Sequence, residues 1–417
     1  MKKKFLFVFL FLFSLFSLEA KADIFDYNNT TTNSNNIIIN NSSSTGNGSI
    51  SAGGIYNGAY EGTIGSSGIA IPATFEAAPI ASLLGGYYNQ LNAYNIAFNN
   101  MDMYMLMTKQ QRQAIKNQNK FATTNTNLFY TPEISSFDNK AGFVRPYASF
   151  ESVRLKNGPK VSNVTWGTYI GLESELYELE NDWDAIFNIY AGYNGSHQAY
   201  HGNSIYQNGG TFGATAMAYK GNFFTGLTAN IGANMAEADT FLGNDDFSML
   251  MNGIATKSGY NYELADGKFI IQPSLMFAYS MVNTFDYTDA AGYRINSNAL
   301  HAFTFEPGVK FIGNLDNGWQ PYAGVSVVMN ALNDADFKSD DFALPELSVK
   351  PYAKYGVGVR KTWGERFTGF FQAFVNSGGR DGIGFQGGFK WQLGKEPEKV
   401  QLSSEKKYIN TNKNQII

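Results

Sequence analysis

The sequence predicts an all-β membrane protein: an antiparallel β-barrel of about twelve strands with an N-terminal helix threading its lumen. Two observations support this fold class. From residue 143 onward, apolar residues recur at every second position, which is the period of a β-strand. The alternating segments are also about nine to thirteen residues long, which matches a tilted strand that crosses a bilayer.

The composition agrees with lipid-exposed strands. Charged residues make up only 16% of the 417 residues, whereas about a quarter is usual for a soluble protein. Aromatic residues reach 15% and the mean hydropathy is -0.24, which argues against a helical membrane protein. The chain has no cysteine, so no disulfide stabilises it. The net charge of -4 gives no argument for nucleic-acid binding.

Residues 1–22 have the pattern of a secretory signal peptide. Three lysines at positions 2–4 precede an apolar run of about 14 residues, and Ala20-Lys21-Ala22 supplies a cleavage site. The run is shorter than the roughly 20 residues that a spanning helix needs. Residues 23–90 are rich in Asn, Ser and Gly, and such a composition buries too little apolar surface to fold alone. We expect them to form a short surface segment.

The stretch 91–122 predicts a helix inside the barrel. Its apolar stripe has 3-4 spacing and consists of Leu91, Tyr94, Phe98, Met101 and Met105. A basic stripe follows it and consists of Lys109, Arg112, Lys116 and Lys120. The alternation of methionines over residues 101–107 would suit a strand instead, but the length of the pattern favours the helix.

Twelve strands are expected over residues 143–393. Their ranges are 143–153, 165–176, 183–196, 206–219, 223–235, 250–262, 269–285, 302–312, 319–330, 347–361, 367–376 and 383–393. The number is even, as single-chain bacterial barrels require. Residues 394–417 form a charged tail that we expect to hang in the periplasm, because such a segment cannot lie in lipid.

In each segment one face is apolar and the other carries Gly, polar groups and charge. A soluble sandwich would bury the apolar face. The strand length, the glycines on the polar face and the tryptophans near strand ends (Trp183, Trp319, Trp363 and Trp391) favour an apolar face in lipid. Charges on the polar face then face water or each other inside the lumen. The expected lumen charges are Arg145, Glu151, Glu173, Glu175, Glu306, Lys310, Lys350, Lys354, Arg360 and Lys390.

The order of signal peptide, secreted segment, helix and C-terminal barrel resembles the autotransporter translocator domain of type V secretion. The resemblance covers about residues 90–393 and includes the stretches AIFNIYAGYNGSHQAY, QPSLMFAYSMVNTFDYTDAAGYRI, FTFEPGVKFIGNLDNGWQPYAGVSVVMN and FTGFFQAFVNSGGRDGIGFQGGFKWQL. It implies a monomeric barrel in the outer membrane of a diderm bacterium, with the upstream passenger at the cell surface. The implied partners are outer-membrane lipid, the barrel-assembly machinery and periplasmic chaperones.

The resemblance also implies an assembly signal in the last strand. The matching residues are Gln386, Gly388, Phe389, Trp391 and Leu393. Any lipid-facing last strand would show a similar alternation, and here the charged tail continues beyond the final aromatic residue. The passenger is shorter than those of most enzymes and adhesins of the family.

Some autotransporters resemble this chain in having an Asn-Asn pair in the lumen helix, where an Asn side chain attacks its own backbone and releases the passenger. Asn99 and Asn100 are the corresponding pair. The reaction needs a desolvated, bent Asn and lumen acids that activate it. The candidate acids are Glu151, Glu173, Glu175 and Glu306. The alternative is an ordinary helical Asn pair.

The remaining motifs favour binding or anchoring over catalysis. The basic stripe either pairs with the lumen glutamates and holds the helix as a plug, or forms a solvated face. His197 and His201 would lie about 13 Å apart on a strand, too far to share a metal. The acidic loops near Asn244 and Asp336 lack Ca²⁺-ligand spacing. We therefore expect no metal, no cofactor and no enzymatic activity, and a translocator that displays its passenger. A small adhesin and a plugged porin-like pore are the alternatives.

Overall fold

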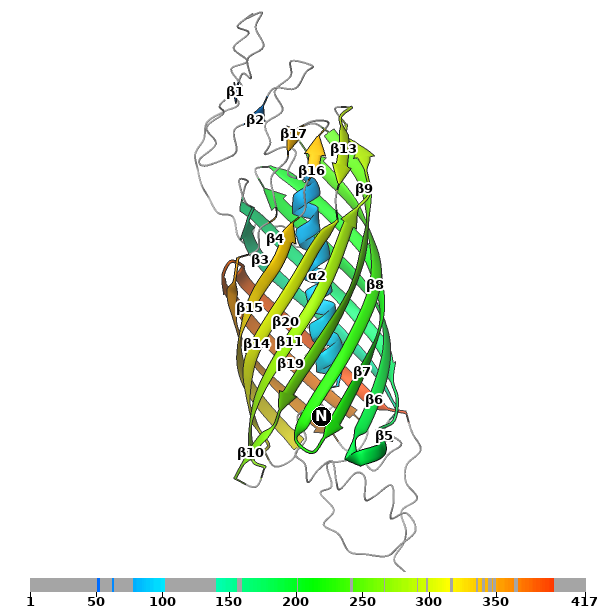
Figure 1. Cartoon of the computed structure of the whole chain (residues 1–417), viewed down its shortest axis with the longest axis vertical. Coiled ribbons are helices and arrows are strands. Elements are labelled where there is room, and N and C mark those ends of the chain that lie inside the picture. Colours follow the sequence, from blue (N-terminus) through cyan, green and yellow to red (C-terminus); the bar gives the residue numbers. More distant parts are fainter. Residues whose placement is uncertain are drawn as a thin grey trace, which may run out of the picture.

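The computed structural model describes residues 78–101 and, with short gaps, residues 140–393, together with 51–52 and 62–63. The expected signal peptide, most of the surface segment, residues 102–122 and the charged tail lie outside the described residues. Within them, twelve long antiparallel strands close into a barrel around one helix (Figure 1). The predicted fold class is confirmed.

Each long strand pairs with the next one along the chain, and the last strand pairs with the first. The strands are β3 (Ala141–Arg154), β4 (Lys160–Glu173), β6 (Asp184–Tyr200), β7 (Asn203–Lys220), β8 (Phe223–Thr240), β9 (Gly243–Tyr260), β11 (Phe269–Thr284), β14 (Leu300–Gly313), β15 (Trp319–Asp334), β18 (Tyr352–Trp363), β19 (Phe367–Gly378) and β20 (Asp381–Gln392). The β20–β3 ladder, in which Gln386 lies opposite Tyr147, closes the barrel and leaves no long edge strand. All twelve expected strands are present.

The barrel has two different ends. We call the end where Ala141 and Gln392 lie the terminal end, and the opposite one the loop end. The short strands β5 (Tyr177–Glu178) and β10 (Tyr262–Leu264) lie at the terminal end. At the loop end a small sheet consists of β12 (Tyr287–Thr288), β13 (Arg294–Ser297), β16 (Phe337–Ser339) and β17 (Phe342–Ala343). A separate pair, β1 (Ser51–Ala52) and β2 (Gly62–Thr63), completes the strands that are described.

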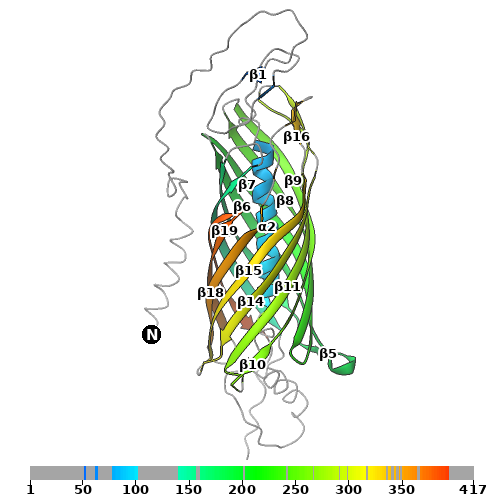
Figure 2. The same cartoon turned by 60° about the vertical axis from the view of Figure 1, so that its left-hand side comes forward.

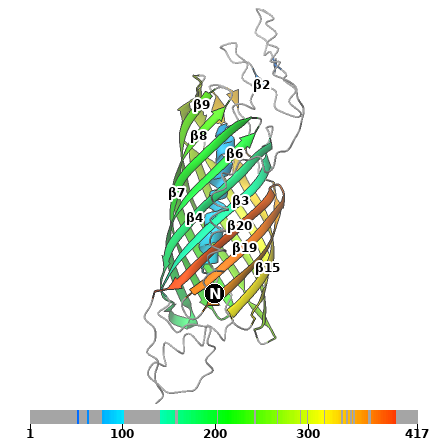
Figure 3. The ribbon, with the colours of Figure 1, turned by 180° about the vertical axis from the view of Figure 1, so that it is seen from behind.

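The height of the wall is uneven. Strands β7, β8 and β9 have 18 residues each, whereas β18, β19 and β20 have 12. The β19–β20 hairpin therefore ends well below the tops of β7–β9 (Figure 3). Its turn lies at the level of the lumen helix, so a side chain in this turn can reach the helix.

The side chains alternate as expected for a bilayer-spanning wall. Phe303 and Phe311 point outward and are 47% and 52% exposed, whereas Thr304 between them is buried in the lumen. The strand directions place all four predicted interfacial tryptophans at the terminal end. Three of them, Trp319, Trp363 and Trp391, lie in strands and expose their rings outward, where an aromatic girdle is expected.

The helix α2 (Ala78–Asn100) lies along the barrel axis, with its first residues at the loop end (Figure 2). This moves the start of the predicted helix from residue 91 to Ala78, whereas residues 102–122 of its predicted range lie outside the described residues. The helix begins at Ala78 and ends at Asn100, so residues 78–90 belong to the lumen and not to the surface segment. Pro79 suits the first helical turn, where its missing N–H is not needed. The Ser82 hydroxyl donates a hydrogen bond of 2.6 Å to the carbonyl oxygen of Pro79.

Within the described part of the chain, no helix is both long and apolar enough to span a membrane.

Candidate functional site

The candidate functional site is the interface between α2 and the lumen wall. A pair of glycines sets how closely the helix approaches this wall. A Cβ on Gly85 would lie 2.2 Å from Ser196 Oγ on β6, and a Cβ on Gly86 would lie 2.8 Å from Val282 Cγ1 on β11. The helix therefore approaches two different parts of the lumen wall closely at the same level, which residues without a side chain allow.

The half of α2 nearer the loop end packs in an apolar cluster. Leu83, Leu84 and Tyr88 are fully buried there, in the same cluster as Met249 and Met251 of β9. Methionine side chains fill irregular gaps well, so they suit a lumen that must fit around a helix.

Two tyrosines of α2 pack their rings in this apolar cluster and also form hydrogen bonds to the wall through their hydroxyl groups. The Tyr87 hydroxyl donates to Asn330 Oδ1 at 2.6 Å and lies 2.9 Å from Thr304 Oγ1. The Tyr94 hydroxyl donates to the carbonyl oxygen of Tyr279 at 2.8 Å. Both rings are fully buried.

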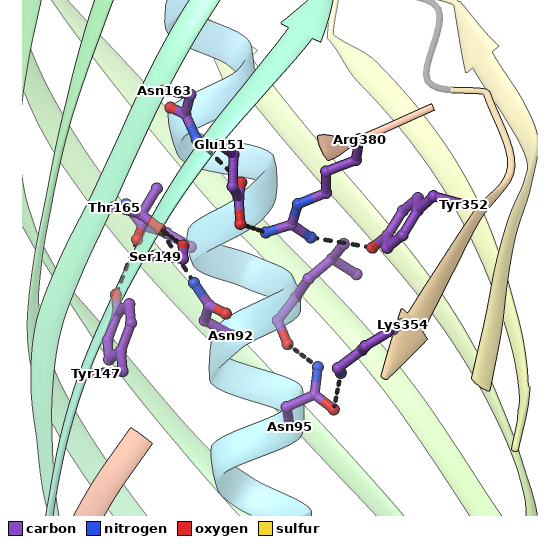
Figure 4. Close-up of polar contacts among 12 residues, drawn as sticks. Asn92, Asn95, Tyr147, Ser149, Glu151, Asn163, Thr165, Tyr352, Lys354 and Arg380 are labelled. Carbon is purple, nitrogen blue, oxygen red and sulfur yellow. Dashed lines mark hydrogen bonds and ion pairs between the residues drawn. The ribbon is translucent and has the colours of Figure 1, made fainter. Parts of the chain in front are cut away.

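Asparagines form the polar face of the helix, and three of them contact the wall at mid-length; Figure 4 shows two of these, Asn92 and Asn95. Asn89 Oδ1 accepts a hydrogen bond of 2.8 Å from the Tyr147 hydroxyl. Asn92 Nδ2 donates to Thr165 Oγ1 at 3.3 Å. Lys354 Nζ donates to Asn95 Oδ1 at 3.5 Å. These asparagines face the wall and not solvent, which explains how an Asn-rich helix is stable in a lumen.

A chain of hydrogen bonds continues from α2 around the wall near the loop end. Gln207 Nε2 donates to the carbonyl oxygen of Ser82 and to Gln198 Oε1, both at 2.8 Å. Gln198 Nε2 donates to Asn163 Oδ1 at 2.7 Å, and Asn163 Nδ2 donates to Glu151 Oε2 at 3.4 Å. We call these four wall residues and Arg380 the polar belt.

Arg380 closes the polar belt from the β19–β20 turn. Its guanidinium pairs with the Glu151 carboxylate and donates to the Tyr352 hydroxyl at 3.0 Å. The same guanidinium stacks on the ring of Tyr88, 3.7 Å from the ring centroid. Arg380 was not among the expected lumen charges, because it lies in the turn between β19 and β20 and not in a strand, where alternation predicts direction. The signal that the sequence offered for this turn is the pair Gly378-Gly379 directly before Arg380, because two glycines allow the chain to turn tightly.

Two further expected charges pair at mid-height. The Lys354 ammonium lies 3.5 Å from the Glu306 carboxylate, which also accepts a hydrogen bond of 2.7 Å from the Ser326 hydroxyl. Lys354 therefore links the wall to Asn95 of the helix. Near the terminal end, Lys390 forms an ion pair with Glu173, and both are buried.

The structure places the other expected lumen charges as follows. Arg145, Lys310 and Arg360 are on the lumen side of their strands, as expected. Two expected lumen charges lie outside the long strands. Glu175 lies in the connection after β4, beyond the end of that strand, and Lys350 is exposed ahead of β18.

The apolar stripe is buried where it is described, since Leu91, Tyr94, Phe98 and Met101 are at most 3% exposed. Met105, Lys109, Arg112, Lys116 and Lys120 lie outside the described residues. The pairing of the basic stripe with lumen glutamates therefore stays a prediction. The partners that the structure shows for Glu151, Glu173 and Glu306 are cations of the wall itself.

Asn99 lies in the last turn of α2. Its side-chain amide donates to Gln386 Oε1 at 3.2 Å, and its carbonyl oxygen accepts from Arg145 Nη2 at 3.3 Å. The expected activating acids Glu151, Glu173 and Glu306 contact wall cations instead of Asn99. Cleavage between Asn99 and Asn100 remains a prediction.

Four residues of the expected assembly signal lie in β20, and Leu393 directly follows this strand. Gln386 and Gly388 face the lumen, whereas Phe389, Trp391 and Leu393 are on the outer face. The backbone N–H of Leu393 donates to the carbonyl oxygen of Lys140 at 2.8 Å, so the closing seam extends to the last described residue. Its recognition by an assembly machine stays a prediction.

Acidic residues gather at the loop end. The Asp245 carboxylate accepts a hydrogen bond from the backbone N–H of Ala290 and lies near Asp246 and Asp289. Among the described side chains, no group of three or more His, Cys, Asp or Glu is arranged to hold a metal ion. His197 stacks on Tyr206, with ring centroids 4.1 Å apart, and His201 lies outside the described residues.

A closed barrel with an apolar outer face and a polar lumen filled by a helix defines a transmembrane β-barrel with a plugged lumen. Residues 142–373 match the family model described as Autotransporter beta-domain, so the chain belongs to the autotransporter β-domain family. This family places the chain in the outer membrane with a translocator role.

Two solved structures share the fold. The β-domain of the Bordetella autotransporter Brka superposes with a TM-score of 0.51 at 16% identity, over 61% of this chain and 99% of that one. The transport unit of AIDA-I from Escherichia coli superposes with a TM-score of 0.53 at 14% identity, over 69% of this chain and 99% of that one. No curated protein sequence matches this chain.

Proposed function

We propose that the barrel anchors the chain in the outer membrane and that the segment before Ala78 is displayed at the cell surface as a short passenger. The observation that supports this most strongly is the direction of α2. Its N-terminus lies at the loop end and its C-terminus near the terminal end, where the barrel strands begin and finish. Everything upstream of Ala78 therefore starts from the loop end.

The filled lumen supports anchoring over open diffusion. Every side chain of α2 described between Ala78 and Asn99 is buried except Asn95, which is partly buried. A helix held on all faces acts as a tether for the upstream segment and as a plug. In this proposal the protein has no enzymatic role, and its assembly depends on the barrel-assembly machinery and periplasmic chaperones.

Protease treatment of intact cells tests the display. One epitope tag is inserted after Thr45, and a control tag is inserted after Glu405 in the C-terminal tail. We expect proteinase K to remove the first tag from intact cells and to leave the second, because only the first lies outside the cell. Both tags should disappear after lysis. If the Thr45 tag survives on intact cells and is lost only after lysis, the segment is not displayed, and the plugged-pore alternative is favoured.

A further inference from the structure

The outer face of the barrel carries apolar runs of two different lengths. On β8 and β11, which flank β9, the outward positions are apolar over 223–235 and 269–281, 13 residues each, broken only by Thr225. On β19 and β3, which flank β20, they are apolar only over 367–375 and 142–150, 9 residues each. Strands β9 and β20 lie six strands apart in the closed order of twelve, so the long and short runs face opposite sides of the barrel.

Polar residues end each run at the loop end. On the short side, Ser377 and Ser152 occupy the next outward positions of β19 and β3, and the exposed Asp381 begins β20 between them. On the long side, Glu237 and Asn283 occupy the next outward positions of β8 and β11. The apolar surface therefore stops at a lower level around β20, where the β19–β20 hairpin is short (Figure 3).

The two lengths correspond to different bilayer thicknesses. The runs on β8, β11 and β19 all start at the terminal end with the first residue of the strand, which is Phe223, Phe269 and Phe367. With a rise of about 3.3 Å per residue and a tilt of about 40°, 13 residues cover about 30 Å of bilayer and 9 residues about 20 Å. The apolar band of an outer-membrane barrel is about 25 Å tall, a value between the two.

A tilt of the barrel cannot remove this difference, because tilting moves both ends of a run together and leaves its height unchanged. A bilayer that matched the short side everywhere would leave Met235, which is 73% exposed on the outer face, in water. A bilayer that matched the long side everywhere would surround the Asp381 carboxylate with lipid, which is unfavourable. Lipid adapts to such a mismatch at modest cost, so local deformation of the bilayer is the favoured solution.

We propose that the barrel thins the bilayer from the loop-end side along β19, β20 and β3, by about 10 Å relative to the lipid beside β8 and β11. The surface around the closing seam thus fits lipid whose chains are short or disordered. This fit follows from the outer face alone and does not depend on what the N-terminal segment does.

Spin labels test the proposal, because the chain has no cysteine and an introduced one is unique. Ala233→Cys on β8 and Ser377→Cys on β19 are both exposed outward positions, ten residues beyond the first residue of their strands. The full chain is folded in dimyristoyl phosphatidylcholine vesicles, and power-saturation EPR compares label access to oxygen, which enriches in lipid, with access to a water-soluble nickel chelate. We expect the oxygen-to-nickel ratio to be several times higher at residue 233 than at residue 377.

The matched controls are Phe223→Cys and Phe367→Cys at the terminal end, where the two labels should give equal ratios. Heat-induced gel shift confirms that each labelled variant is folded. Equal ratios at residues 233 and 377 overturn the proposal, because the bilayer is then equally thick on both sides. A lipid-like label at residue 367 beside a water-like label at residue 223 also overturns it, because the short side is then only displaced toward the loop end.

Discussion

Arg380 shows how a single residue of a short hairpin can hold the lumen helix. It pairs with Glu151 of β3, donates to Tyr352 of β18 and stacks on Tyr88 of α2. Both members of the ion pair are at most 5% exposed. Removing one charge from such a pair leaves the other buried and uncompensated, which costs more than removing both.

The first prediction is a double-mutant cycle on this pair. We expect Arg380→Met and Glu151→Leu each to lower the free energy of unfolding by about 3–5 kcal/mol, and the double variant to lose less than either. Urea unfolding in detergent micelles, followed by tryptophan fluorescence, measures this. Arg294→Met is the control, because its exposed pair with Asp286 should contribute only about 0–1 kcal/mol. Strictly additive costs in the cycle would contradict the role given to Arg380.

The sequence predicted most lumen charges because they alternate with apolar residues in long strands. Arg145, Glu306 and Lys354 follow this rule and face the lumen. Lys350 and Glu175 lie an even number of residues from lumen-facing positions, as the rule requires. They are beyond the strand ends, however, where alternation no longer determines which way a side chain points. Arg380 was missed because the alternation rule applies only to residues in strands. It lies in a turn, and only the low wall on its side brings it to the helix.

At the scale of one element, α2 is where the sequence reading was least accurate. A 3-4 apolar stripe predicts a helix with one buried face, but α2 is buried on all faces. Its earlier part contains Pro79 and the pair Gly85-Gly86, which in the sequence resemble turn signals. In the lumen the proline suits the first turn, and the glycines are the places where the helix touches the wall. Tertiary contacts outweigh the weak intrinsic preference of Gly against helix.

The second prediction tests that contact. We expect Gly85→Leu to lower the free energy of unfolding by about 1–3 kcal/mol, because its side chain would meet Ser196, Gln198 and Gln207. A displaced helix should also open the lumen, so single-channel conductance in planar bilayers should rise toward that of a chain lacking residues 78–100.

The matched control is Gly387→Leu. A Cβ at Gly387 on the outer face of β20 would meet no atom nearer than 3.7 Å, so this change should leave both conductance and stability near those of the parent. If Gly85→Leu and the helix deletion both leave the conductance unchanged, α2 is not a plug.

At the scale of the whole molecule, the period of two was sufficient to predict all twelve strands, because each wall segment faces lipid on one side and the lumen on the other. Their ends were less predictable. Strand β9 was expected over 250–262 but begins at Gly243, because near the loop end polar residues such as Asp246 occupy the outer face and the apolar alternation fades. Where a strand contacts the lipid, the bilayer requires apolar residues at every second position. Beyond the lipid the strand is still held by backbone hydrogen bonds, but its sequence no longer has to alternate.

Closure of the barrel leads to the last prediction, which concerns assembly. The seam between β20 and β3 ends at Leu393, so removing residues 394–417 should leave the amount of folded protein in the outer membrane unchanged. In contrast, a charge on the outer face should reduce the amount of folded protein in the outer membrane. Trp391→Asp and Trp319→Asp place the same charge at the terminal end, on rings that are 38% and 44% exposed.

Loss of lipid packing alone would affect these two positions alike, since both rings lie in the same girdle and the cost of a charge depends on depth. If β20 also carries an assembly signal, Trp391→Asp should reduce the outer-membrane level well below that of Trp319→Asp. The heat-induced shift in gel mobility of outer-membrane fractions measures folded barrel for each variant. Equal losses would show that the last strand acts only as one more lipid-facing strand.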